Sequence, residues 1–471
     1  MSDIKFGTDG WRAIIAEQYT NDNVARVAHA SAQWLIKTGA PRIAVVGHDC
    51  RFGGNMFAEV VASVLAVNGI KVILSDRMVS TPMISLATRN FSAGVGIVIT
   101  ASHNPPSYNG YKLKAPFGGP MPPDQVAQVE ALIPEKNIHD LAELTLGQFV
   151  NQGLVELTNI EQQYIDQIEA NFDLDSIREN SDKFAYDPMF GAGQDVMKKL
   201  LPNITYLHAE HNPSFNGTAP EPIHRNLSEL SNLIASSNGN IHCGLATDGD
   251  ADRIGLYNSK GEFVDSHHII LLLIKYLVEE KGLSGKVVNA FSVSPRVRKM
   301  CEHFGLEFQV VKIGFKYVAE IMVKDDVLLG GEESGGIAIK THIPERDGIW
   351  MGLTVWEYMV KSGKTLEDLI NDAYEIVGPF SFERIDLKLS EEQKERIMKN
   401  CASGNYLAFG DMEIERSENI DGYKYFFKDD QWVMIRPSGT EPVLRTYAES
   451  SSSESAFDIL KKTHDTLLNE G

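Results

Sequence analysis

"AGVGIVITASHNPPSYNGYK", residues 93–112, joins an apolar run to a polar turn. The Val, Ile and Gly of residues 93–99 favour a buried strand. Pro105 and Pro106 prevent its continuation, because proline lacks a backbone N–H and restricts the residue before it. Ser102 therefore lies at the C-terminal end of a predicted strand. Ligands bind at that edge of open α/β sheets, so Ser102 could be a nucleophile, a phosphate ligand or an ordinary turn residue.

Helix-type and strand-type patterns alternate along most of the chain. The first block has amphipathic periodicity at 22–37, 55–67 and 81–89, and β-rich runs at 42–47, 71–75 and 93–99. Two further blocks repeat the alternation, with predicted helices at 159–170, 193–201, 227–236, 267–281, 295–304 and 347–361. Three consecutive α/β units of similar size predict three α/β domains with mostly parallel mixed sheets.

The C-terminal part differs because its strand-type runs follow one another. Predicted helices 391–399 and 453–468 flank runs such as QWVMIR (431–436) and VLRTYAE (443–449), which is typical of an α+β domain. We therefore expect four domains packed around a central cleft, with boundaries at 1–154, 155–256, 257–373 and 374–471.

The composition excludes several classes of partner. Lys and Arg number 44 against 64 Asp and Glu, which gives a net charge of −20, so nucleic acid and anionic membranes are poor partners. The four cysteines form no C-x-x-C pair, and the purest apolar run, IILLLI at 269–274, is too short to span a membrane. We expect a cytoplasmic protein, and the sequence does not distinguish a monomer from a homodimer.

The stretch TDGDADR, residues 247–253, carries three alternating aspartates: Asp248, Asp250 and Asp252. On an extended chain they project from one face, where they repel one another unless a hard cation such as Mg²⁺ neutralises them. An EF-hand would need Gly and Glu where Arg253 and Ser259 stand, so that interpretation fails. A solvated acidic turn is the alternative to a metal site.

The stretch GGEESGG, residues 330–336, follows an apolar strand pattern. Glycines on both sides free the backbone, while Glu332, Glu333 and Ser334 offer carboxylates and a hydroxyl that could accept sugar hydroxyls. A plain glycine-rich hairpin explains the pattern equally well.

The stretch RPSGTEP, residues 436–442, lies between two strand patterns. Arg436 offers a planar fork of donors, Ser438 and Thr440 offer hydroxyls, and Gly439 lets the backbone approach an oxyanion closely. The chemistry is that of a phosphate site, with an ordinary hairpin loop as the alternative.

These four loops occur in the order serine, metal, sugar and phosphate, one in each predicted domain. Together with FGTDGWR at 6–12, this arrangement resembles the α-D-phosphohexomutase family, the phosphoglucomutases and phosphomannomutases. The resemblance spans nearly the whole chain. It implies that Ser102 carries a phosphoryl group and that Asp248, Asp250 and Asp252 hold one Mg²⁺ together with a phosphoserine oxygen.

The resemblance also assigns the remaining site residues. Glu332 and Ser334 correspond to sugar contacts, and the grip on the non-reacting phosphate corresponds to Arg436, Ser438, Gly439 and Thr440. Cationic or proton-handling positions around the reacting centre correspond to Arg12, His103, Lys112 and Arg253, with further correspondences at Lys312 and Arg51. Many members continue the sugar loop with a histidine where this chain has Gly336, so another residue must replace that histidine or its role is omitted.

The implied reaction moves a phosphoryl group between the 1- and 6-positions of a hexose through a hexose 1,6-bisphosphate, which also serves as activator. Glucose phosphate is the first expected substrate, and mannose and glucosamine phosphates are the alternatives. A metal-dependent sugar phosphatase and a noncatalytic sugar-phosphate binding protein are the alternatives outside this class. Exchange of the two phosphates predicts that the fourth domain hinges on the others.

Overall fold

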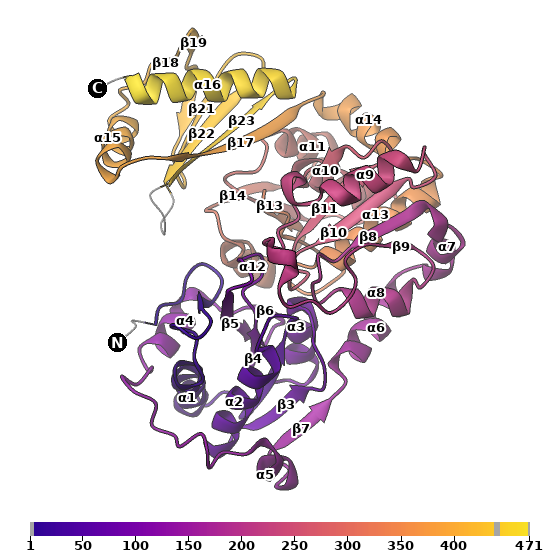
Figure 1. Cartoon of the computed structure of the whole chain (residues 1–471). Helices are drawn as coiled ribbons and strands as arrows, with labels where there is room; N and C mark the ends of the chain where they lie inside the picture. Colours follow the sequence, from indigo (N-terminus) through magenta and orange to yellow (C-terminus); the bar gives the residue numbers. More distant parts are fainter. Residues whose placement is uncertain (1–3, 438–442, 470–471) are drawn as a thin grey trace.

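The computed structural model describes residues 4–437 and 443–469 (Figure 1). Its first sheet has the strand order β1-β5-β4-β2-β3-β7, with β6 paired to β5. The strands are β1 (Trp11–Ile14), β2 (Ile43–His48), β3 (Lys71–Ser75), β4 (Val95–Ile99), β5 (Tyr108–Ala115), β6 (Gly119–Pro120) and β7 (Val155–Thr158). Strands β4, β2, β3 and β7 run parallel, whereas β5 runs antiparallel to β4 and to β1.

The helices of this first unit have clear local causes. Thr20 accepts from Asn23 N to cap α1, and α1 stops at the left-handed Gly39. Ser80 caps α3 in the same way, with a proline in its first turn. The helices are α1 (Asn21–Thr38), α2 (Gly54–Val67), α3 (Thr81–Asn90), α4 (Pro123–Glu130) and α5 (Leu146–Asn151).

The second sheet has the order β12-β11-β10-β8-β9. Strands β8, β9 and β10 run parallel, and the chain turns after β10 to return antiparallel as β11. The strands are β8 (Phe184–Asp187), β9 (Thr205–Tyr206), β10 (Cys243–Thr247), β11 (Ile254–Asn258) and β12 (Phe263–Val264). The helices are α6 (Ile160–Asn171), α7 (Leu174–Glu179), α8 (Gln194–Leu200) and α9 (Ser228–Ser236), with 3₁₀ turns at Ser181–Lys183, Phe215–Gly217 and His224–Asn226.

The third sheet has the order β14-β13-β15-β16, with an antiparallel pair at one edge. Its strands are β13 (Lys286–Ala290), β14 (Phe308–Val311), β15 (Val327–Gly331) and β16 (Ile337–Ile339). Its helices are α10 (Ser266–Glu279), α11 (Arg296–Phe304), α12 (Phe315–Lys324), α13 (Gly348–Ser362) and α14 (Leu366–Val377). The three sheets therefore share one plan, a parallel centre with antiparallel strands on one side.

The fourth sheet, β17-β23-β22-β21-β20, is antiparallel throughout. Its strands are β17 (Ser381–Lys388), β20 (Arg416–Glu418), β21 (Tyr423–Phe426), β22 (Trp432–Pro437) and β23 (Val443–Ser450). Helices α15 (Glu391–Ala402) and α16 (Ser453–Asn469) and the small pair β18 (Ala408–Phe409) and β19 (Met412–Glu413) complete this unit. The three α/β domains and the C-terminal α+β domain have the predicted fold class.

Strand pairing shifts the domain limits by a few residues from the predicted ones. Strand β7 belongs to the first sheet although it follows residue 154, because it pairs with β3. The predicted limit at 256 falls inside β11, and the limit at 373 falls inside α14. Periodicity locates elements but does not show which sheet a strand joins.

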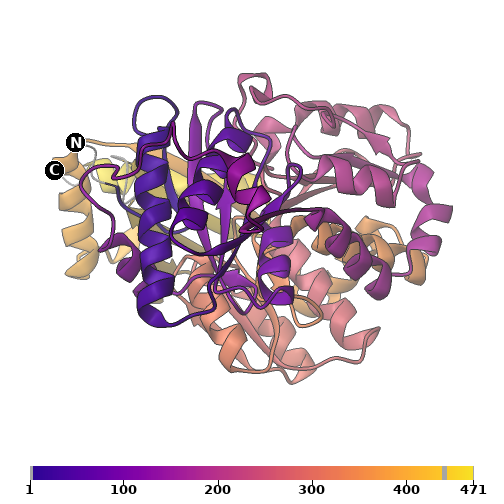
Figure 2. The same ribbon diagram turned by 90° about the horizontal axis from the view of Figure 1, so that it is seen from below.

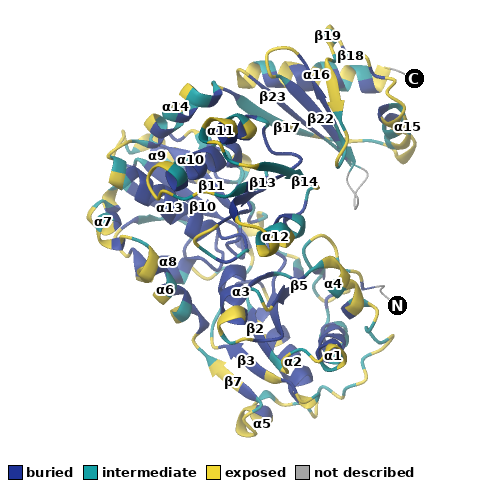
Figure 3. Ribbon diagram, turned by 180° about the vertical axis from the view of Figure 1, so that it is seen from behind, coloured by how far each residue is buried: buried dark blue, intermediate teal, exposed yellow. Residues whose placement is uncertain are grey.

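The domains pack through buried side chains rather than linkers. The largest hydrophobic cluster runs from α3 through β10 and α13 to β15, and so joins the first three domains. Figure 1 shows the fourth domain beside β13, β14 and α11, and in the view of Figure 2 the first domain, in indigo, lies in front of the fourth, in yellow. Figure 3 shows buried strands under helices whose outer faces are exposed. Within residues 4–437 and 443–469, none of the helices has the length and apolarity needed to cross a membrane.

Candidate active site

Ser102 follows β4 in a tightly held turn. Its φ of 52° lies in the left-handed region, which a non-glycine residue adopts only when its surroundings enforce it. Thr100 Oγ1 accepts from Ser102 N at 2.9 Å. Arg51 donates to the carbonyls of Ser102 (2.6 Å), Asn104, Pro105 and Tyr108, so its role is to shape the serine loop.

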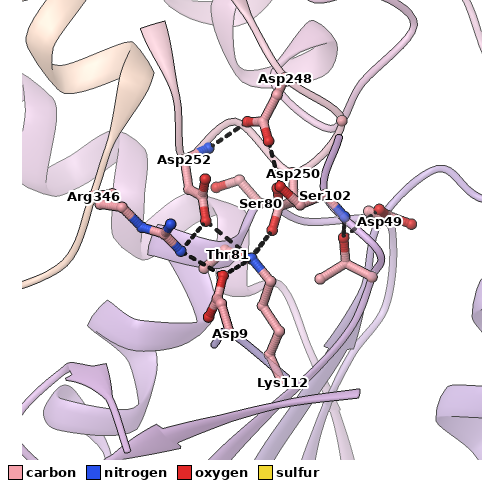
Figure 4. Close-up of polar contacts among 12 residues, drawn as sticks. Asp9, Asp49, Ser80, Thr81, Ser102, Lys112, Asp248, Asp250, Asp252 and Arg346 are labelled. Atoms are coloured by element: carbon pink, nitrogen blue, oxygen red, sulfur yellow. Dashed lines mark hydrogen bonds and ion pairs between the residues drawn. The ribbon is translucent and has the colours of Figure 1, made fainter. Parts of the chain in front are cut away.

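The metal loop meets the serine loop directly. Ser102 Oγ donates to Asp248 Oδ2 at 2.6 Å (Figure 4). A Cβ at Gly249 would lie 2.6 Å from the Ser102 carbonyl oxygen, so only glycine permits this approach. The serine and metal loops, predicted separately, form one site.

The three aspartates that follow β10 converge as predicted. Asp248, Asp250 and Asp252 are fully buried and offer oxygens that all lie within 4.8 Å of one another. One oxygen of Asp250 and one of Asp252 have no hydrogen-bond partner among the described residues. Unpartnered buried carboxylate oxygens are costly, and a hard divalent cation is the ligand that such a set fits.

Lys112, on β5, supplies positive charge to this cluster. Its Nζ lies 2.7 Å from Asp250 Oδ2, 3.0 Å from Asp252 Oδ2 and 2.8 Å from Asp9 Oδ2. Although burial alone would lower the pKa of Lys112, these three carboxylates raise it above its usual value. Burial and the charges of Asp250 and Asp252 raise the pKa of Asp248 well above its usual range. The cluster therefore favours any further cation.

Arg346 is a site residue that sequence reasoning missed. Its Nη2 lies 2.6 Å from both Asp9 Oδ2 and Asp252 Oδ2 (Figure 4). Its Nη1 lies 3.9 Å from Glu332 Oε2. Asp9 was missed as well, although it stands within the quoted FGTDGWR motif. The signal for Arg346 was the PERDG stretch, residues 344–348, in which charges precede a helix start.

The sugar-type loop is the connection of an antiparallel pair, β15 and β16. Glu332 is buried and accepts from Gly314 N at 3.0 Å, and burial raises its pKa to about 7. Ser334 lies two residues further along the same turn, half-buried. Ile254 N donates to Gly335 O at 3.1 Å, which fastens this loop to the strand after the metal loop.

The side chain of Arg346 explains why this chain has Gly336 where many family members have a histidine. A Cβ at this position would collide with the Cδ of Arg346. The Arg346 side chain therefore fills the space that a larger residue would occupy, and its guanidinium supplies the cation on that side of Glu332.

The remaining cationic residues gather around Ser102. His103 Nδ1 lies 3.3 Å from Ser102 Oγ, and Arg12 Nη1 donates to Asn104 Oδ1 at 2.6 Å in the same loop. Arg253 Nη1 lies 3.7 Å from Glu221 Oε1. Burial, with Arg253 and Arg12 adding repulsion, lowers the pKa of His103 well below its usual value, so this imidazole is neutral near pH 7.

Arg436 and Lys312 belong to another part of the molecule. Arg436 lies near the C-terminal end of β22, and its Nη2 lies 3.3 Å from Asp421 Oδ2. Lys312 is exposed and follows β14. The other predicted phosphate residues, Ser438, Gly439 and Thr440, lie outside the described residues.

Known domain families match all four domains of the chain. Four domain families match in order: the phosphoglucomutase/phosphomannomutase alpha/beta/alpha domains I, II and III at residues 3–139, 162–261 and 265–377, and the C-terminal domain at 387–464. The chain belongs to the phosphoglucomutase/phosphomannomutase family. Members of this family are phosphohexomutases, that is, isomerase-type phosphotransferases, which identifies the chain as an enzyme of this class.

Relatives of this phosphohexomutase match over nearly the whole chain. The phosphoglucomutase/phosphomannomutase of Thermococcus kodakarensis is 29% identical over 97% of this chain and 96% of its own length. The probable phosphoglucosamine mutase of Methanosphaera stadtmanae is 30% identical over 98% of both chains. The solved putative phosphomannomutase from Thermus thermophilus superposes with a TM-score of 0.87 at 30% identity, covering 99% of this chain and 100% of that one.

Proposed function

We propose that this phosphohexomutase interconverts hexose 1-phosphate and hexose 6-phosphate through a phosphorylated Ser102. The observation that carries the proposal is the 2.6 Å contact between Ser102 Oγ and Asp248 Oδ2, inside a buried trio of carboxylates. A phosphoryl group on Ser102 would add about −1.5 to −2 charge beside those carboxylates, which only a cation makes tolerable. A phosphorylated Ser102 and the three aspartates can therefore share this buried space when a cation is bound between them.

Asp248, Asp250 and Asp252 would hold the cation, for which Mg²⁺ is the candidate because the donors are oxygens and the family is magnesium-dependent. When bound, Mg²⁺ supplies charge neutralisation to the phosphoryl oxygens. The unpartnered oxygens of Asp250 and Asp252 support this assignment.

The first transfer breaks the bond between phosphorus and Ser102 Oγ and forms a bond to the free sugar hydroxyl. The proton of that hydroxyl goes to a neighbouring base, and Ser102 Oγ leaves with the electron pair of the broken bond and takes up a proton, which restores the serine hydroxyl. His103 is the better candidate for this base, because its pKa is lowered while that of Lys112 is raised. Lys112, Arg12 and Arg253 then act through their positive charge.

The second transfer requires the resulting hexose 1,6-bisphosphate to turn over. Its other phosphate then lies beside Ser102, which takes it back. Glu332 and Ser334 would hold the sugar in both orientations, while Arg436 with Ser438, Gly439 and Thr440 would bind the non-reacting phosphate. Added hexose 1,6-bisphosphate would reload dephosphorylated enzyme and so act as the activator. We place this reaction in the cytoplasm, as the four free, buried cysteines support.

Glucose phosphate is our first substrate, and glucosamine phosphate is a second candidate because a relative is named a probable phosphoglucosamine mutase. The test compares kcat/KM for glucose, mannose and glucosamine 1-phosphates with Mg²⁺ and catalytic hexose 1,6-bisphosphate. Conversion without release of inorganic phosphate is expected. Steady phosphate release would instead indicate a phosphatase, and no turnover of any of the three would overturn the proposal.

A further inference from the structure

Two consecutive backbone N–H groups, those of Ile313 and Gly314, donate to carboxylates of different domains. Ile313 N lies 3.0 Å from Asp421 Oδ2 in the fourth domain, and Gly314 N lies 3.0 Å from Glu332 Oε1 in the third. The same Asp421 oxygen lies 3.3 Å from Nη2 of Arg436. A continuous chain of contacts therefore runs from Glu332 to Arg436 through the backbone of two residues.

The backbone segment Ile313–Gly314, in the middle of this series of contacts, has a fixed conformation. Gly314 has φ 129°, a conformation open to glycine alone, and it is the N-cap residue directly before helix α12. A Cβ there would also lie 3.0 Å from Cγ2 of Thr8, so the first domain bounds the segment on another side. Figure 1 shows α12 between the first domain and the fourth. The direction of the two N–H groups is therefore fixed by packing.

Asp421 and Arg436, at the fourth-domain end of this series of contacts, are partly buried, and the Arg436 guanidinium still has a donor without a partner among the described residues. The side chains of Asp421 and Arg436 are 27% and 22% exposed, and the side chain of Ile313 packs against the cluster that contains Phe291 and Trp432. Nε of Arg436 is buried and has no hydrogen-bond partner among the residues that the structure describes. Asp421 thus orients the guanidinium without using all of its donors, which leaves a place for an anion.

We propose that Asp421 and the Ile313–Gly314 segment form a link through which binding of a phosphate at Arg436 positions the sugar-binding carboxylate of Glu332. The inference rests on the proposed function, because Arg436 and Glu332 contact substrate only in that scheme. In the link, Asp421 is a positioning residue. It holds the fourth domain against Ile313, and Gly314 N–H then keeps Glu332 turned toward the sugar.

A double-mutant cycle tests the link during turnover, with kcat/KM measured for the hexose 1-phosphate that the wild type converts fastest. Asp421→Ala should lower kcat/KM about tenfold in the wild-type background and less than about threefold in the Glu332→Ala background, because residues that act as a unit are not additive. Equal losses in both backgrounds would show that Asp421 and Glu332 act separately. Asp421→Asn keeps an acceptor for Ile313 N but loses the charge that pairs with Arg436, and should lower kcat/KM about threefold.

Asp430→Asn is the matched control. Asp430 also joins the third and fourth domains, through a 2.5 Å contact with Lys299, but it lies outside the link. Its φ of 59° suits asparagine, so the substitution leaves the backbone unstrained. We expect less than about a twofold change in kcat/KM in either background, since surface ion pairs contribute little.

Hydrogen exchange tests the link without any activity. The amides of Ile313 and Gly314 should exchange about tenfold faster in Asp421→Ala than in the wild type, and inorganic phosphate should slow them in the wild type only. If the wild type converts no hexose phosphate but these exchange differences appear, the proposed function fails and the link stands. If the wild type is an active mutase and both amides exchange alike in Asp421→Ala and Asp430→Asn, the link is wrong.

Discussion

Ser102 Oγ lies 2.6 Å from Asp248 Oδ2, although 146 residues separate them in the chain. Each residue follows the C-terminal end of a strand, β4 for Ser102 and β10 for Asp248. Because the first two domains pack with these two strand ends facing each other, a hydroxyl and a trio of carboxylates share one buried space.

Ser102→Ala should remove the mutase activity, because alanine cannot carry a phosphoryl group. A loss of at least about 10³-fold in kcat is expected for a missing nucleophile. The measurement is turnover of hexose 1-phosphate together with intact-mass analysis, which should show one phosphate on the wild type and none on the variant. Ser107→Ala, an exposed serine in the same loop, is the control and should retain both. Full activity of Ser102→Ala would contradict the scheme.

Asp250→Asn should weaken Mg²⁺ binding by at least about 100-fold, because one buried anionic ligand of the trio is lost. In the wild type, Mg²⁺ at 100 times its Kd should stabilise the fold by about 2.7 kcal/mol, and a chelator should reverse this. Calorimetric titration with MgCl₂ and melting curves with and without the metal measure both effects. Asp187→Asn, which changes a buried carboxylate at the end of neighbouring β8, should bind Mg²⁺ like the wild type.

The sequence predicted those parts of the site that stand at strand ends. Ser102 could be placed because an apolar run stops at prolines, and the aspartates because their spacing of two residues puts them on one face. Asp9 and Arg346 could not be paired, since they come together only when residues 337 positions apart meet across two domains. Such contacts depend on domain packing, which no local pattern records.

The same limit applies to helix α12. It is absent from the predicted elements because only Lys312, Ile313 and Gly314 separate β14 from the first residue of the helix, so the strand and helix patterns run close together. The boundary is set by Gly314, whose backbone conformation ends the strand-like segment and starts the helix. The contact between Ile313 N and Asp421 could not be predicted either, because the start of helix α12 that positions Ile313 was not predicted.

Gly336→His should destabilise the protein, because the new side chain collides with Arg346. Overpacking of this kind costs about 1–3 kcal/mol, which melting curves will show as a lower Tm. Arg346→Ala alone should cost about 3–5 kcal/mol by leaving buried carboxylates unpaired. In the Arg346→Ala background the space is clear, so adding Gly336→His should lower the Tm less than it does in the wild type.

Gly335→His serves as the control for this pair. A Cβ at Gly335 meets the backbone oxygen of Ile254 instead of Arg346, so Gly335→His should lower the Tm equally in the wild-type and Arg346→Ala backgrounds. Equal behaviour of the two histidine variants would mean that Arg346 does not fill the space beside Gly336.

Lys424, on β21, should make stability depend on pH. It is 3% exposed, its Nζ lies 4.2 Å from the Trp432 ring centre and 3.2 Å from Val293 O, and burial lowers its pKa to about 7. In the unfolded chain a lysine keeps its proton up to about pH 10.4. Between these two values the unfolded state binds more protons, so the free energy of unfolding rises as pH rises from about 7 toward 10.

Lys424→Met should abolish this rise and should be more stable than the wild type at pH 6, where the buried ammonium costs most. Above pH 10 the advantage should vanish, since the wild-type lysine is then neutral in both states and still donates to Val293 O. Melting curves at pH 6 and pH 9 measure the effect. The control is Lys428→Met, an exposed lysine of the same domain, which should follow the wild type at both pH values. If Lys424→Met and the wild type show the same pH dependence, Lys424 is not the titrating group.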